Sequence, residues 1–275
     1  MIIDAHQHFW QFDPVRDAWI DASMGVLRQD FLPTDLAPIL AANGVDGCVA
    51  VQADQSLAES DFLLELADRH PFIRGVVGWV DLCAPDVEEQ LARYAAHPKF
   101  VGVRHILQGE PAGFMARPDF RRGISLLHRY GLTYDLLVYH YQLPEAIDLV
   151  DAFPEQRFVL DHLAKPVIDG PPDPAWVRNL RTLAGFPGVS CKLSGMVTEV
   201  PGYQWTAEAL QPYLTVAVEA FGPDRLLYGS DWPVCLLAAD YAAQFAVYRN
   251  FPGLDSTGCF GSNAERIYGL PPVTH

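Results

Sequence analysis

Short apolar runs alternate with longer amphipathic segments along almost the whole chain. Apolar runs of this length, bounded by Gly, Pro or polar residues, predict strands. They predict eight strands, at 2–5, 47–52, 73–80, 100–104, 133–138, 157–161, 189–193 and 226–229. Between them, apolar residues at helical spacing predict helices at 57–69, 86–96, 120–130, 143–153, 176–185 and 206–221. Strands that alternate with helices form parallel sheets, so the pattern predicts an α/β fold, a closed (β/α)8 TIM barrel rather than an open sheet.

No shift in composition and no Ser/Gly-rich linker divides the 275 residues, so we expect residues 1–275 to form a single domain. The longest irregular segment, 9–34, follows the first predicted strand and contains Trp10, Phe12, Trp19 and Phe31. These aromatic residues favour a folded segment that covers the barrel mouth. A plain surface loop is the alternative.

Charge and composition exclude several classes of partner. The formal net charge is −15, and we find no basic patch that could neutralise nucleic-acid phosphates or an anionic membrane surface. No apolar run reaches membrane-spanning length, and the chain does not start with a secretory signal. The five cysteines form no CxxC pair, which favours reduced thiols in a cytoplasmic protein. The oligomeric state, including a homo-oligomer, stays open.

Polar and titratable side chains gather where the predicted strands end, the place where barrels of this kind carry their functional residues. A buried polar group costs free energy unless it has a role or a partner, so the set as a whole indicates a site. The set comprises His6, His8, Gln52, Arg104, Tyr139, His140, Asp161, His162, Lys192, Ser194 and Asp231.

The chemistry that these residue types favour is hydrolysis. Asp231 can take a proton from water, and histidines with one carboxylate can hold a zinc ion that keeps an open position for water. Arg104 and Lys192 can stabilise charge on a carbonyl oxygen, although either could instead form a structural salt bridge. The alternative for Asp231 is a purely structural role as the cap of a helix. Trp10 and Trp232 fit core packing as well as a sugar platform.

The chain lacks the motifs of other enzyme classes. It has no GxSxG nucleophile elbow and no GxGxxG or GxxxxGK[ST] phosphate loop, which disfavours a serine hydrolase and a nucleotide cofactor.

Several phrases at the strand ends resemble the amidohydrolase superfamily, and within it the amidohydrolase-related branch that includes sugar lactonases. The resemblance runs from the first strand to 263–268. The phrases are Asp4-Ala5-His6-Gln7-His8-Phe9-Trp10, Gly102-Val103-Arg104-His105, Asp161-His162-Leu163-Ala164-Lys165-Pro166, Cys191-Lys192-Leu193-Ser194-Gly195 and Tyr228-Gly229-Ser230-Asp231-Trp232-Pro233.

The resemblance implies that Asp231 is a general base and that His6, His8 and Asp231, with His162, surround any metal. Arg104 stands where two-metal members place a bridging ligand, and a fixed cation would repel a second ion. We therefore expect at most one divalent metal, zinc, and some relatives are thought to need none. Arg104 and the histidines would then hold the substrate carbonyl.

The substrate that the resemblance implies is a sugar-derived lactone, L-fuconolactone or a similar aldonolactone. Gln52, Tyr139, His140, Lys192, Trp10 and Trp232 are the candidate substrate contacts. The alternatives are a metal-dependent decarboxylase of an aromatic acid on the same fold and a sugar-acid binding module without catalysis.

Overall fold

Eight parallel strands form one sheet in which each strand pairs with its neighbour in the sequence. The computed structural model describes residues 1–254 and 258–271. The strands are β1 (Ile3–Gln7), β2 (Gly47–Val51), β3 (Ile73–Gly78), β4 (Phe100–Ile106), β5 (Thr133–Leu137), β6 (Phe158–Leu160), β7 (Val189–Leu193) and β8 (Leu226–Tyr228). The predicted (β/α)8 barrel is confirmed, and every predicted strand overlaps an observed one.

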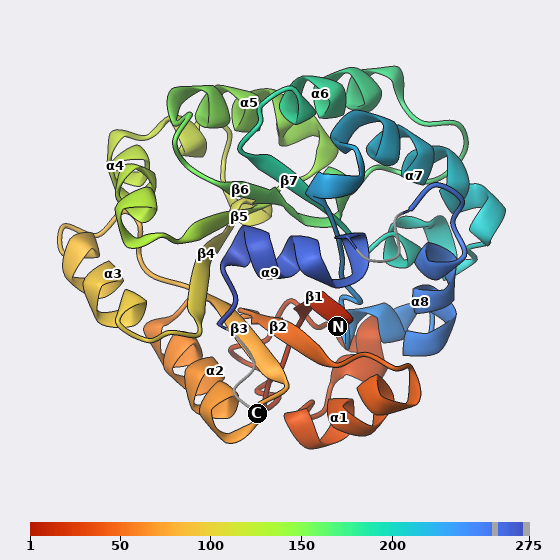
Figure 1. The fold of residues 1–275 in the computed structure, drawn as a ribbon, viewed down its shortest axis with the longest axis horizontal. Coiled ribbons are helices and arrows are strands. Elements are labelled where there is room, and N and C mark those ends of the chain that lie inside the picture. The colour runs from red at the N-terminus through yellow and green to blue at the C-terminus, as the bar shows by residue number, and fades with distance from the viewer. Residues whose placement is uncertain (255–257, 272–275) are drawn as a thin grey trace.

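Helices surround the sheet, and a short one, α9, lies across one end of the barrel (Figure 1). They are α1 (Pro33–Ala42), α2 (Leu57–Arg69), α3 (Val87–Ala95), α4 (Pro118–Leu127), α5 (Leu143–Ala152), α6 (Pro174–Ala184), α7 (Ala207–Phe221), α8 (Tyr241–Arg249) and α9 (Asn263–Tyr268). No helix in the described ranges is long and apolar enough to cross a membrane.

Local sequence explains where α2 begins and which face it buries. Ser56 caps the helix, because its hydroxyl accepts a hydrogen bond from the backbone N–H of Glu59 at 3.2 Å. Leu63, Leu66 and Ala67 are buried on one face, and the helix packs on β3. This placement leaves the Glu59 carboxyl at the start of the helix, beside the loop that follows β2.

The first and last strands meet and close the barrel. The backbone N–H of His8 donates to the carbonyl of Trp232 at 2.7 Å, and the N–H of Asp231 donates to the carbonyl of His6 at 2.8 Å. Asp4 adds a side-chain link, since its carboxylate accepts from the backbone N–H of Ser230 at 2.8 Å. The residues that follow β1 and β8 therefore face each other at the barrel mouth.

Small and branched apolar residues fill the lower part of the barrel, and the short helix α9 covers the end where β1 begins (Figure 1). Ala264, Ile267 and Tyr268 of α9 belong to this buried cluster. Apolar side chains of the described residues therefore fill and cover this end of the barrel.

Three helices differ from expectation, because α1, α8 and α9 were not predicted. α1 begins at Pro33, inside the segment 9–34 that we expected to be irregular, and it also contains Pro38. A proline at the start of a helix is well tolerated, so Pro33 is compatible with the helix, whereas Pro38 lies in its interior, where proline is disfavoured and obscures the helical pattern. The rest of that segment forms loops and one 3₁₀ turn, Ala22–Leu27.

Candidate active site

A cavity of about 520 Å³ opens at the carboxyl ends of the strands. Its volume lies in the range of small-molecule sites. Residues at the ends of β4 and β5 and in the loops after β1, β2, β4, β5, β6, β7 and β8 line it. Trp19 and Met24 of the segment 9–34 lie in its wall, which agrees with the predicted cover over the mouth.

Three side chains converge at the bottom of the cavity. The Nε2 atoms of His6 and His8 lie 3.2 Å apart. The Oδ1 atom of Asp231 lies 3.3 Å from Nε2 of His8 and 3.7 Å from Nε2 of His6. The alternation of the strand points both histidines to one side, as the His-x-His spacing predicted. Nε2 of His162 lies 3.8 Å from the same Asp231 oxygen.

Asp231 has an unusual backbone conformation, with φ at +56° in a residue that is not glycine. Such a conformation costs free energy and is typical of functional sites. Its side chain is only 3% exposed. Burial alone would raise the pKa of its carboxyl, but the imidazoles of His162, His8 and His6 hold the pKa below its usual range. Asp231 is therefore a buried carboxylate that faces the cavity.

Neighbouring groups fix how the imidazoles are oriented. Nδ1 of His8 lies 2.8 Å from the carbonyl oxygen of Val51, which can only accept, so this nitrogen donates there and fixes the ring. Nδ1 of His162 lies 2.8 Å from the hydroxyl of Ser194. Burial lowers the pKa of His162 to about 4, so this imidazole is neutral at pH 7.

Beneath His6 lies a buried layer of opposite charges. The ammonium of Lys192 lies 3.0 Å from Asp161 Oδ1 and 3.0 Å from His6 Nδ1, and it also contacts Asp135. Arg104 donates to Asp161 Oδ2 at 3.0 Å and to the backbone carbonyl of Gln52. Burial opposes ionisation of Asp161, but Lys192 and His6 nevertheless hold its pKa well below the usual range. Burial and the nearby Lys192 lower the pKa of His6.

The positions of His6, His8 and Asp231 fit the ligands of a divalent ion. His6, His8 and Asp231 each offer one ligand atom, and the pairs are 3.2, 3.3 and 3.7 Å apart. Two ligands of a tetrahedral zinc ion are separated by roughly 3.3 Å when the bonds are about 2.0 Å long. Asp161 lies 3.3 Å from Nδ1 of His6 and can orient that ring, as carboxylates behind histidine ligands do. Arg104, 3.3 Å from Nε2 of His6, places a fixed positive charge at the edge of this set.

The structure separates the candidate residues into two groups. His8, Arg104, Tyr139, His162 and Asp231 line the cavity, and His6 lies directly behind His8 and Asp231.

Five of the six candidate substrate contacts do not line it. Gln52 and Lys192 are fully buried below the mouth, because Lys192 lies within β7 rather than after it. His140 is turned toward the backbone, with Nδ1 3.2 Å from the carbonyl oxygen of Lys165. Trp10 and Trp232 are 2% and 1% exposed. Both pack against Phe31, so the structure places them in the core and not on a sugar-binding surface.

Several residues of the cavity wall were not among the candidates. Lys165 comes from the loop after β6, and Thr198, Glu199 and Tyr203 come from the loop after β7. Gln108 comes from the loop after β4. Of these residues, only Lys165 could have been noticed in the sequence, because it belongs to the phrase that contains His162.

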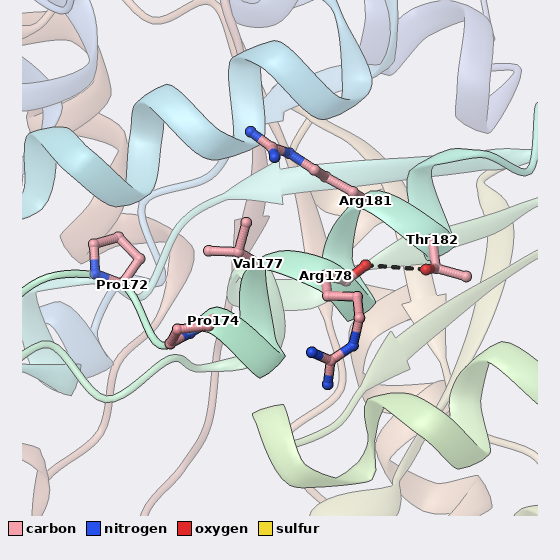
Figure 2. Close-up of a pocket in the computed structure, with 6 residues that line it drawn as sticks. All are labelled: Pro172, Pro174, Val177, Arg178, Arg181 and Thr182. Carbon is pink, nitrogen blue, oxygen red and sulfur yellow. Dashed lines mark hydrogen bonds between the residues drawn. The ribbon is translucent and has the colours of Figure 1, made fainter.

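A second pocket lies on the outside of the barrel, at the start of α6 (Figure 2). Pro172, Pro174 and Val177 form part of it together with the exposed Arg178 and Arg181. The guanidinium of Arg181 contacts Glu219 on α7 at 3.0 Å. This pocket shares no residue with the cavity at the strand ends. Two buried histidines and Asp231 belong to that cavity.

The fold and the cluster together define a (β/α)8 barrel with a cluster of histidines and a carboxylate at its mouth. The chain belongs to the amidohydrolase family, whose sequence profile matches residues 3–270.

Two curated relatives cover nearly the whole chain. The chain is 39% identical to an L-fucono-1,5-lactonase from Burkholderia multivorans over 285 aligned positions, which cover 98% of this chain and 96% of the relative. It is 37% identical to an L-fucono-1,5-lactonase from Burkholderia ambifaria, over 98% of this chain and 95% of that one.

A solved amidohydrolase structure from Burkholderia multivorans, with bound zinc, has a TM-score of 0.94. The identity to it is 38%, and the match covers 98% of this chain and 100% of that chain.

Proposed function

We propose that this protein hydrolyses a sugar-derived lactone, L-fucono-1,5-lactone or a similar aldonolactone, to the open aldonic acid. The observation that carries the proposal is the buried carboxylate of Asp231, which faces a cavity together with two imidazoles and one guanidinium, with the imidazole of His6 directly behind it. The two lactonase relatives, which match almost end to end, support the same reaction. A lactone of this class is formed by oxidation of the cyclic sugar, so a dehydrogenase would act before this enzyme.

In the proposed reaction Asp231 takes a proton from a water molecule as that water attacks the lactone carbonyl carbon. The carbon becomes tetrahedral, and negative charge moves onto the former carbonyl oxygen. Arg104 lines the cavity and carries N–H groups that can stabilise this oxygen. Collapse of the intermediate breaks the bond to the ring oxygen, and the proton held by Asp231 returns to that leaving oxygen.

His6, His8 and Asp231 are the residues that would hold a divalent ion, and we propose zinc. The ion would supply Lewis acidity and a more acidic water in the same place. The roles of Arg104 and of the buried layer around Lys192 do not depend on it.

The test is proton release from a panel of aldonolactones, followed with a pH indicator, for enzyme with and without a chelator. Rapid opening of L-fucono-1,5-lactone or an epimer is the expected result, and the chelated sample decides whether the ion is needed. Asp231→Asn removes the base while keeping the size of the side chain. We expect it to lower kcat by about 10²- to 10⁴-fold. Unchanged turnover in that variant would remove Asp231 from the mechanism.

The same panel separates the proposal from the decarboxylase alternative. Decarboxylation of an aromatic acid consumes a proton and releases carbon dioxide, whereas opening of a lactone releases a proton. Activity on aromatic acids, with silence across the lactones, would contradict lactone hydrolysis.

A further inference from the structure

The loop after β6 follows a path that few sequences adopt. Four consecutive residues that are not glycine, from His162 to Lys165, have φ values of +53°, +53°, +58° and +46°. L-amino acids rarely enter this left-handed region, and they normally do so singly. The backbone N–H of Lys165 donates to the carbonyl of His162 at 2.7 Å, so the segment is a tight left-handed turn with a bond between positions three apart.

The result of this turn is to aim two side chains at one cavity. In a turn with three residues per revolution, side chains three positions apart lie on the same side. His162 and Lys165 are three positions apart, and both line the cavity. The indole N–H of Trp176 donates to the carbonyl of Leu163 at 2.9 Å, which fixes the turn from α6. The strained backbone therefore places an ammonium group beside the histidine that faces Asp231.

Lys165 meets a carboxylate from the neighbouring loop. Its Nζ lies 3.1 Å from Oε1 of Glu199, which ends the 3₁₀ turn Val197–Glu199 after β7. The two side chains are 19% and 20% exposed, and both line the cavity. Burial works against the charge on Lys165, but Glu199 and Asp231 raise its pKa above the usual value. A charged pair thus forms part of the cavity wall.

We propose that the Lys165–Glu199 pair binds adjacent hydroxyl groups of the lactone ring and so selects polyhydroxylated lactones. This inference rests on the proposed function. A hydroxyl group both donates and accepts, so one hydroxyl can donate to Glu199 while its neighbour accepts from Lys165. Two fixed partners of opposite character recognise two hydroxyls at a set spacing, which makes the pair sensitive to their stereochemistry.

The pairing of the charges also matters for the product. The lactone is neutral, but the aldonate that forms from it carries a carboxylate. An unpaired ammonium in the wall would attract that carboxylate and delay its release. Glu199 balances the charge of Lys165, so the wall can bind hydroxyls without holding the anion.

The experiment compares an aldonolactone with δ-valerolactone, which has the same six-membered cyclic ester and no hydroxyl groups. δ-Valerolactone is measured both as a substrate and as a competitive inhibitor, so its affinity is obtained in either case. Lys165→Met should lower kcat/KM for the aldonolactone by about 10- to 100-fold, mainly through KM. The kcat/KM and the inhibition constant of δ-valerolactone should change by no more than about twofold, because the groups that act on the ester are intact. Lys165→Arg, which keeps the cation, should recover part of the loss.

Glu199→Gln tests whether Glu199 balances the charge of Lys165. It also tests the pair if Lys165→Met fails to fold. It should raise KM for the aldonolactone and strengthen inhibition by the aldonate, since Lys165 is left without its counter-charge. Glu219→Gln is the matched control, because it breaks an ion pair of similar length, with Arg181, on the outer surface. We expect it to change neither quantity.

Two results would overturn the inference. Equal losses for the aldonolactone and δ-valerolactone would show that Lys165 acts on the ester or on the fold. Unchanged KM for the aldonolactone in both variants would show that the pair does not touch the sugar. If the wild-type enzyme opened no lactone at all, the proposed function would fail, which is a different and recognisable outcome.

Discussion

Gly195 is a residue whose replacement should separate the geometry of the site from the stability of the fold. It follows Ser194 after β7, and its φ is +64°. A Cβ atom at this position would lie 2.6 Å from Nδ1 of His162 and 2.8 Å from its Cγ. Gly195→Ala therefore adds one methyl group directly against the imidazole of the site.

Two costs follow from this change. The first is conformational, since an L-residue in the left-handed region costs about 1–2 kcal/mol. The second is displacement of the ring. Ordinary contacts to a Cβ atom begin at 3.4 Å, so His162 must move by about 0.8 Å to relieve the closest one. A shift of about 1 Å in a catalytic group can cost about 10²-fold in rate.

Gly44 provides a matched control, because its φ is +67° and nothing lies within 4 Å of the added Cβ. Gly44→Ala should lose about 1–2 kcal/mol in the free energy of unfolding, measured with urea, and Gly195→Ala at least as much, because the displaced ring adds its own cost. Only Gly195→Ala should lose lactonase activity, with kcat/KM reduced by about 100-fold. Kinetics are measured well below the melting temperature of both variants.

Wild-type activity in both variants would refute the reasoning, since it would show that the position of His162 does not matter for turnover. A loss of activity in Gly44→Ala as large as in Gly195→Ala would refute it as well. Backbone strain remote from the site would then be sufficient to explain the defect.

Two further predictions concern groups around the site. Burial raises the pKa of Glu59 from 4.5 to about 7, so the folded state keeps this proton longer than the unfolded state and stability falls as the pH rises through that window. Glu59→Gln has no such proton to lose, so its free energy of unfolding should rise relative to that of the wild type by roughly 3 kcal/mol from pH 4 to pH 8. Urea unfolding at several pH values measures this difference. A difference between variant and wild type that stays constant over this range would contradict the raised pKa. Ser194→Ala removes the hydroxyl 2.8 Å from Nδ1 of His162. It should lower kcat by roughly 10-fold without changing the unfolding midpoint by more than a few degrees, whereas full kcat would show that His162 is oriented without Ser194.

Residues that directly end a strand could be found from the sequence. Apolar runs bounded by Gly or Pro locate the strands, and the period of the strand puts His6 and His8 on one side. Asp231 follows the last strand and meets them because the barrel closes. These relations depend only on local pattern and on the known direction of parallel strands.

Other parts of the site depend on information that the pattern does not contain. Lys165 reaches the cavity through a left-handed turn, and no local preference predicts four such residues in succession. Lys192 was expected at the mouth but lies deeper, since one residue along a strand decides the depth of a side chain in the barrel. Trp10 and Trp232 are buried because Phe31 packs on both, a contact that joins separate segments.

The closure of β1 on β8 also determines when the site comes into existence during folding. His8 and Asp231 are 223 positions apart in the chain, so their contact closes nearly the largest loop that the molecule contains. Contacts between distant positions carry the largest entropic cost and slow folding, whereas helices form early from local contacts. A refolding chain can therefore regain most of its helical signal while its lactonase activity is still absent. Recovery of activity reports the joining of the two ends of the sheet, and a fragment that stops before Asp231 would lack the carboxylate however well its helices formed.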